Sequence, residues 1–288
     1  MIFKNKQNLL LALIVTTFFS IANAQQFHVF RKKQMFLGLT GGVNYTLPTV
    51  KEHHNVLIPL DLSSSGEEKE YEKLFQNNST QFGLYFSYSI DRNFSIVFQP
   101  SYYTYKFKYL TNYTWIDTVD IMNFTQEMKH VQSISTFSLP LSVRWDFTTN
   151  QISPYIQAGV FTDFRHRAYK SVYHDFTIDG EVDEKKASGT TNNTLVNPNF
   201  NKFNFGVTAG LGVSYYAKYF VIGIEGNYRY GFSNIVNDRN RYSDISGFTA
   251  QYLDVLDQMK LGNLNFQVTL LFPIDNSLSL NVLRRSKY

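Results

Sequence analysis

Strict alternation of apolar and small polar residues is the feature that most constrains this chain. In one segment Phe203, Phe205 and Val207 alternate with Asn204 and Gly206, and the pattern continues to residue 214. A period of two places successive side chains on opposite faces of a β-strand, so each such segment predicts a strand with one apolar face. Eight segments show the pattern: 37–45, 81–90, 94–102, 136–147, 152–163, 203–214, 220–230 and 263–272.

The connections between these segments alternate in length. Residues 91–93, 148–151 and 217–218 form hairpin turns of the usual few residues. Long polar stretches occupy 47–80, about 110–129, about 170–200 and 232–258. Short turns at one end and long loops at the other, around an even number of antiparallel strands, are typical of an outer-membrane barrel. We therefore predict an all-β fold, an eight-stranded antiparallel up-and-down transmembrane β-barrel with long extracellular loops and periplasmic N- and C-termini.

A soluble lipocalin-type barrel also has eight strands, but its apolar face surrounds a ligand. Three features favour the membrane version. The polar face is mostly Gly, Ser, Thr and Asn, small enough for the narrow interior of eight strands. The chain has no cysteine, whereas small secreted β domains often carry disulfides. Aromatic residues also gather near the strand ends, where the girdles of a membrane barrel lie: Tyr45, Tyr88, Tyr102, Trp145, Tyr215, Tyr228 and Tyr230.

The N-terminus has the pattern of a secretory signal peptide. Lys4 and Lys6 precede an apolar stretch at 9–19, and Ala22-Asn23-Ala24 matches the small-x-small pattern of a cleavage site. The stretch is shorter than the roughly 20 residues of a membrane-spanning helix. We predict a cleaved signal peptide at 1–24 and one barrel domain at 25–288, with strands within about 35–272 and a periplasmic tail at 273–288.

Several function classes find no support in the sequence. Without cysteine there is no disulfide, thiolate metal site or cysteine nucleophile. The net charge of +4 is spread along the chain, so it is not the clustered basic face of a nucleic-acid-binding protein. No histidine has a spacing that sets a base against a nucleophile or completes a metal site. We therefore expect no catalytic, cofactor-binding or metal-binding residues, and a protein that is not an enzyme.

Five local patterns follow one another along the chain. They are FLGLTGGVNYT at 36–46, FSLPLSVRWDF at 137–147, PYIQAGV at 154–160, FGVTAGLGVS at 205–214 and YRYGFSNI at 228–235. This ordered set resembles the PorT-like outer-membrane β-barrel family of Bacteroidetes-type bacteria, and the likeness runs from about residue 35 to 272.

The resemblance implies an outer-membrane barrel and extends to an accessory role in type IX secretion and gliding. The family groups proteins with different or unknown roles. This chain also departs from the usual C-terminal aromatic of outer-membrane barrels, because residues 273–288 follow Phe272.

Six charged residues lie on the predicted polar face and would line the interior: Arg144, Asp146, Asp163, Arg165, Glu225 and Arg229. Unpaired charges in a narrow barrel are unfavourable, so we expect Glu225 to pair with Arg144 or Arg229. The network either fills and rigidifies the interior or lines a small pore. We also predict a bulge at Pro140, because proline removes a hydrogen-bond donor from the sheet.

Aromatic residues in the long stretches are candidates for a binding surface, because binding residues concentrate on loops carried by a rigid scaffold. They either contact a protein or lipopolysaccharide, or cover one another on strands that extend beyond the membrane. The candidates are Tyr71, Phe75, Trp115, Phe124, Tyr173 and Phe176.

Three hypotheses remain from the sequence. The first is a non-enzymatic scaffold or accessory partner in the cell envelope, linked to type IX secretion through the resemblance. The second is a narrow porin-like passive channel, and the third is a loop-based surface adhesin or binder. The expected partners are outer-membrane lipid or lipopolysaccharide and envelope or secretion-complex proteins, without nucleic acid, and a monomer is favoured.

Overall fold

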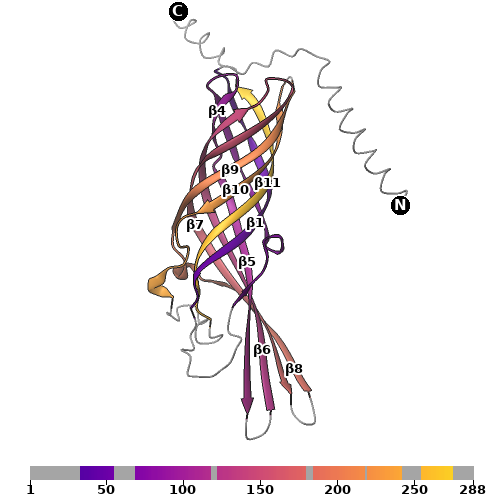
Figure 1. Ribbon diagram of the computed structural model, residues 1–288, viewed down its shortest axis with the longest axis vertical. Coiled ribbons are helices and arrows are strands. Elements are labelled where there is room, and N and C mark those ends of the chain that lie inside the picture. Colours follow the sequence, from indigo (N-terminus) through magenta and orange to yellow (C-terminus); the bar gives the residue numbers. More distant parts are fainter. Residues whose placement is uncertain are drawn as a thin grey trace, which may run out of the picture.

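The computed structural model describes residues 33–54, 69–117, 122–179, 184–217, 219–241 and 254–274. It contains one antiparallel β-sheet (Figure 1). The predicted signal peptide at 1–24 and the tail from residue 275 onward lie outside the described residues. Among the described residues, no helix is long and apolar enough to cross a membrane.

The sheet closes into a ring of eight strand positions. Going round the ring, β1 is followed by β3, by β4 and β5 together, by β6, β7, β9, β10 and β11, and then by β1 again. The bounds are β1 Met35–Glu52, β3 Asn78–Ser89, β4 Phe94–Phe98, β5 Ser101–Asp117, β6 Met122–Asp146, β7 Ile152–Asp179, β9 Phe203–Tyr216, β10 Val221–Gly231 and β11 Gln258–Ile274. The predicted eight-stranded antiparallel barrel is therefore confirmed.

The two faces of the barrel wall differ as the alternation predicts. Leu39, Phe82, Leu211 and Ile224 are exposed on the outer face, whereas inward-facing residues such as Asn265 are buried. An apolar exterior around a polar interior is the arrangement of a membrane barrel and the reverse of a soluble lipocalin-type barrel.

Two prolines meet at one place in the wall without a bulge. Pro100 separates β4 from β5, and Pro140 lies on β6 opposite Gln99. Pro140 cannot donate to the Gln99 carbonyl, but the Ser101 hydroxyl donates to that carbonyl at 2.7 Å. The bulge predicted at Pro140 is wrong, because this substitute donor lets both flanking pairings keep their register. The register shift in β6 lies between Ser135 and Thr136 instead.

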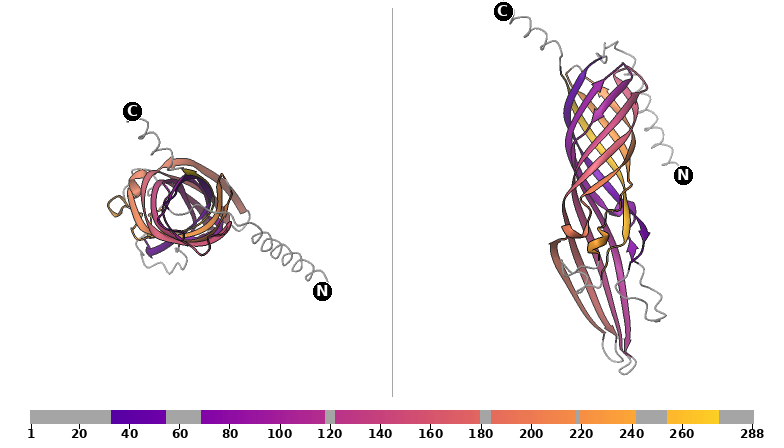
Figure 2. Two further views of the ribbon diagram at one scale, coloured as in Figure 1. Left: turned by 90° about the horizontal axis from the view of Figure 1, so that it is seen from above. Right: turned by 90° about the vertical axis from the view of Figure 1, so that its left-hand side faces the viewer.

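Three barrel strands continue beyond the barrel and form an antiparallel extension with β8 (Glu184–Leu195), in the order β5, β6, β7 and β8. β6 has 25 residues and β7 has 28, whereas about 10 residues of a tilted strand cross a membrane. The extension projects from the end opposite the short turns (Figures 1 and 2). The long loops predicted at about 110–129 and 170–200 are therefore mostly strand.

The polarity of the two faces inverts where the extension begins. In β5, Tyr103, Tyr105, Phe107 and Tyr109 point inward and are buried, while the alternate residues are polar and partly exposed. Water replaces lipid outside this part of the wall, so the apolar residues move to the inner face. They join a hydrophobic core at the extension-side end of the barrel with Met128, Ile134, Ala168, Val172, Val196, Phe200, Val236, Leu256 and Met259.

Small elements complete this end. β2 (Glu70–Tyr71) pairs with β5 at Leu110 and Tyr109. The single-turn helices are η1 (Leu74–Gln76), η2 (Asn197–Asn199) and η3 (Asp238–Asn240).

Candidate functional site: the barrel interior and its charged rim

The interior at the short-turn end is organised by Arg144 on β6. Its Nη2 donates to Asp146 Oδ1 at 2.7 Å and to Ser214 Oγ at 2.9 Å. The guanidinium lies 3.5 Å from the centre of the Tyr155 ring, a geometry in which the cation and the ring face attract each other. The charge of Arg144 is thus compensated by Asp146, which lies two residues further along the same strand.

Glu225 on β10 lies at the centre of the interior and is 1% exposed. Its carboxylate accepts hydrogen bonds from Tyr155 OH at 2.6 Å, Asn227 Nδ2 at 2.9 Å and Gln99 Nε2 at 3.2 Å. Gln267 is a fourth donor. The expectation that Glu225 pairs with Arg144 or Arg229 is wrong, because four neutral donors satisfy its charge and each arginine has a carboxylate of its own.

Arg229, also on β10, forms the second ion pair of the interior. Its Nη2 lies 2.8 Å from Asp163 Oδ1 on β7 and 2.7 Å from Ser138 Oγ. The guanidinium is held between two rings, 4.0 Å from the centre of Phe161 and 4.2 Å from the centre of Tyr103. This pair crosses the interior and ties non-adjacent strands together, because β7 and β10 are separated in the sheet by β9.

Five of the six predicted interior charges are therefore buried side chains that are each hydrogen-bonded within the interior, and Arg165 is the exception. It is half-buried at the extension-side rim and donates its Nε to the backbone carbonyl of Asn201 at 3.2 Å. Arg165 shares the inward parity of Asp163 and lines a pocket with it, but it lies at the end of the regular alternation, just before the bulge.

A second set of charges, which the sequence analysis missed, closes the extension-side end of the interior. We call Lys69, His130, Lys170, Asp254 and Asp257 the charged rim cluster. All five are buried, with Lys69 the most exposed at 7%. Lys69 Nζ lies 3.1 Å from Asp257 Oδ1, and Lys170 forms an ion pair with Asp254. Continued alternation along β6 places His130 on the inner face, whereas on β7 it would place Lys170 on the outer face, and only the bulge at His166 turns Lys170 inward.

Two tyrosines complete the charged rim cluster. Tyr109 OH donates to Asp254 Oδ2 at 2.7 Å, and Tyr71 OH donates to Asp257 Oδ2 at 2.7 Å. The His130 ring stacks on Tyr109 with centroids 4.6 Å apart. Burial, together with Lys170 and Lys69, holds the pKa of His130 well below its usual value of 6.5. His130 is therefore neutral, and its 3.7 Å contact with Asp254 is not an ion pair.

The charged rim cluster has a structural role. Asp254, Asp257 and His130 have side chains without solvent exposure, so a substrate in solution could not reach them. The cluster instead joins β5, β6 and β7 to the segments before β2 and before β11. Within the described part of the chain, no three His, Asp or Glu residues are grouped so that they could hold a metal ion.

The predicted aromatic binding residues do not form one surface. Tyr71 points into the charged rim cluster, whereas Phe75 on η1 is 68% exposed and packs against Tyr45 on the outer wall at 5.4 Å. Tyr173 on β7 is exposed. The other three lie on the strands of the extension: Trp115 on β5, its cross-strand partner Phe124 on β6, and the half-buried Phe176 on β7.

Comparison with known proteins agrees with this architecture. Residues 23–237 match the family described as "Outer membrane protein beta-barrel domain". The chain belongs to this family. It is therefore an outer-membrane β-barrel protein, and the matched range runs from before β1 through the end of β10. No curated protein matches the sequence.

Several solved structures of outer-membrane proteins are similar to this barrel. Ail, the attachment invasion locus protein of Yersinia pestis, is 10% identical, with 84% of this chain and 99% of that chain covered and a TM-score of 0.26. OprG from Pseudomonas aeruginosa is 12% identical, with coverage of 85% and 97% and a TM-score of 0.38. The outer membrane protease OmpT from Escherichia coli is 13% identical, with coverage of 86% and 99% and a TM-score of 0.39.

Proposed function

We propose that this outer-membrane barrel is a non-enzymatic scaffold with a closed interior, whose extension binds another protein of the cell envelope. The observation that carries the proposal is the number of buried side chains that occupy the interior. Buried side chains follow one another from Arg144 at the short-turn end, through Glu225 and Arg229, to the charged rim cluster. An eight-stranded barrel leaves an interior that side chains can just fill.

The filled interior argues against the porin-like alternative, because ions would have to displace hydrogen-bonded charges to pass. Recording from the purified mature barrel in planar lipid bilayers tests this directly. We expect no steady conductance. A reproducible open level from pure protein would reject the closed interior and support the channel.

The extension offers two open edges for a partner strand. β8 ends the sheet on one side, and on the other β2 pairs only with Tyr109 and Leu110 of β5. The edges from 111 to 117 and along β8 pair with no further strand among the described residues. Residues 111–116 of β5 contain neither charge nor proline, the features that usually block strand addition. An extended segment of another protein could therefore add to this edge by main-chain hydrogen bonds.

The proposed orientation places the extension outside the cell and both termini in the periplasm. β1 begins and β11 ends at the same end of the barrel as the short turns (Figure 1). Outer-membrane barrels have their short turns on the periplasmic side. Protease added to intact cells should cleave within the extension and should spare a tag placed after residue 288.

The link to type IX secretion is part of this proposal and is supported by the sequence resemblance alone. The test is to cross-link intact cells, extract the tagged barrel in mild detergent and identify what co-purifies. Reproducible recovery of secretion-complex proteins would support an accessory role, whereas recovery of the barrel alone would reject it.

A trimmed variant makes this experiment specific for the extension. Residues 112–127 and 175–188 would each be replaced by an Asn-Gly turn, which leaves the Thr111–Met128 and His174–Gly189 pairs and the charged rim cluster in place. We expect the variant to fold and to lose the partner. A control in which only 118–121 is replaced should keep it. If the same trimming abolished attachment of cells to a surface and left the envelope partners bound, the adhesin alternative would hold instead.

A further inference from the structure

An aromatic row marks the extension-side edge of the lipid-facing surface over four strands. Tyr102, Phe137, Phe164 and Phe203 are successive cross-strand partners on β5, β6, β7 and β9. The ring centroids of Tyr102 and Phe137 are 5.2 Å apart, as are those of Phe164 and Phe203. Aromatic girdles lie at the level of lipid headgroups. The side chains of the next residues toward the extension therefore contact the headgroups themselves.

A β-bulge in β7 determines which side chains occupy that next step. Thr136 pairs with Arg165 and Ser135 pairs with Arg167, which makes His166 the extra residue. Regular alternation would turn Arg167 inward, but beyond the bulge Ala168 is the buried inward residue, and both His166 and Arg167 are exposed. Bulges often re-aim side chains beside functional sites.

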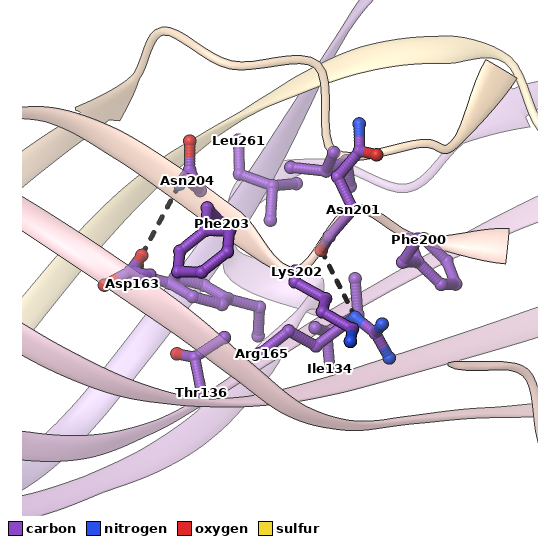
Figure 3. A pocket seen from close by; sticks show the side chains of 12 residues that line it. Ile134, Thr136, Asp163, Arg165, Phe200, Asn201, Lys202, Phe203, Asn204 and Leu261 are labelled. Carbon is purple, nitrogen blue, oxygen red and sulfur yellow. Dashed lines mark hydrogen bonds between the residues drawn. The ribbon is translucent and has the colours of Figure 1, made fainter. Parts of the chain in front are cut away.

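Lys202 adds a second strong cation beside this bulge. The backbone N–H of Arg165 donates to the Lys202 carbonyl at 2.8 Å, which places the two residues side by side. Both also line a pocket together with Phe200, Phe203 and the interior residue Asp163 (Figure 3). On the extension side of the aromatic row, the barrel wall therefore combines cationic side chains with apolar residues that line the pocket.

Arg167 and Lys202 have no acidic partner among the described residues. Neither takes part in an ion pair there, and the same holds for His166. Arg167 pairs with Ser135 on β6, and Ser135 pairs with Thr104 on β5. Two hydroxyl residues therefore continue the cross-strand row that begins at Arg167.

The carboxylate of Asp163, which also lines the pocket, is already paired with Arg229. Exposed cations beside hydroxyl groups suit a phosphate group, to which arginine can donate two hydrogen bonds.

We propose that Arg167, Lys202 and His166 bind the phosphate of a membrane-lipid headgroup, while its acyl chains lie along Phe137, Phe164 and Phe203. The lipid belongs to the leaflet on the side of the extension, which is the outer leaflet in the orientation proposed above. The site requires the barrel to be in a membrane, but it does not depend on the partner or on the closed interior. Its failure would leave both of those proposals standing.

The test compares lipids that differ only in phosphate. The mature barrel is reconstituted in phosphatidylcholine nanodiscs that contain either diphosphoryl lipid A or the same lipid without phosphates, and native mass spectrometry counts the molecules retained. We expect the wild type to retain the phosphorylated form preferentially. Arg167→Gln with Lys202→Gln should weaken that preference about fivefold for each charge removed, the usual effect of one basic residue at a charged membrane surface.

A matched control removes two positive charges elsewhere. Arg92→Gln with Lys51→Gln changes exposed residues in a short turn and on β1, and it should leave the preference unchanged. The heat-dependent gel shift of folded barrels verifies that each variant is folded, and Lys202→Gln alone replaces the double variant if that one fails to fold. Equal retention of both lipids by the wild type, or an equal loss in the control, would overturn the proposal. Protection of the barrel by inorganic phosphate alone, in pure phosphatidylcholine, would assign the site to a free anion and would overturn it too.

Discussion

The Tyr155 hydroxyl on β7 donates to the Glu225 carboxylate on β10 at 2.6 Å, across the interior of the barrel. The two strands are not neighbours, since β9 lies between them. Glu225 forms no ion pair among the described residues, so its negative charge depends on this bond and on three amide donors. The interior is therefore held together by a charged acceptor that neutral side chains surround.

Replacing Glu225 by alanine should destabilise the barrel by about 3 kcal/mol, since a buried charge is lost and four donors are left without their acceptor. Urea unfolding of the barrel in detergent micelles, followed by tryptophan fluorescence, measures the change. Leu39→Ala on the lipid-facing surface is the control and should cost less. An unfolding free energy that does not change in Glu225→Ala would show that the hydrogen-bond network does not support the fold.

The Arg229–Asp163 ion pair should show strong coupling. Arg229→Met leaves Asp163 as an uncompensated buried charge, and removing one partner of such a pair typically costs about 3–5 kcal/mol. The double variant Arg229→Met with Asp163→Leu should recover most of that loss, because no charge then stays unpaired. Arg229→Lys should also destabilise, since an ammonium group cannot stack between Phe161 and Tyr103 as a guanidinium does. Additive effects of the two single variants would contradict the pairing.

Two glycines of the barrel wall should differ in their tolerance of a methyl group. A Cβ on Gly212 would lie 2.6 Å from the hydroxyl oxygen of Tyr155, whereas a Cβ on Gly41 would find its nearest neighbour at 3.9 Å. Gly212→Ala should therefore displace Tyr155 from Glu225 and destabilise the barrel by about 1–3 kcal/mol, as overpacking does. Gly41→Ala serves as the control and should be close to neutral. Equal unfolding temperatures for the two variants would refute the close approach.

Acidification should weaken the extension-side end of the barrel. Burial, with Lys170 and Lys69, lowers the pKa of His130 from 6.5, so the unfolded chain takes up a proton that the folded chain refuses. The free energy of unfolding should then fall by about 1.4 kcal/mol between about pH 7.5 and about pH 5.5. Unfolding titrations at both pH values measure the difference. His130→Gln should reduce it, and His54→Gln accounts for the smaller contribution of His54, whose pKa is also lowered.

Local patterning was enough to predict the barrel strands, because lipid on one side and a narrow interior on the other impose a period of two on each of them. It failed where the environment changed. In β5 the apolar residues move from the outer face at Tyr102 to the inner face at Tyr103 and Tyr105, and the reversal resembled the end of a strand. The sequence pattern therefore predicts loops where the extension lies, and it gives no sign of the charged rim cluster between the extension and the barrel interior.

The sequence by itself determined the strand number, the apolar exterior, the polar interior and most of the charges inside it, since these follow from composition and spacing along single strands. Only the tertiary structure decided the partners. Arg144 could have reached Glu225 by parity alone, but the closed sheet places Asp146 beside it, and Glu225 is left to Tyr155, Gln99, Asn227 and Gln267. Ring closure and register determine which side chains of non-adjacent strands face each other and at what level along the barrel axis. The pattern of a single strand contains neither of these two properties.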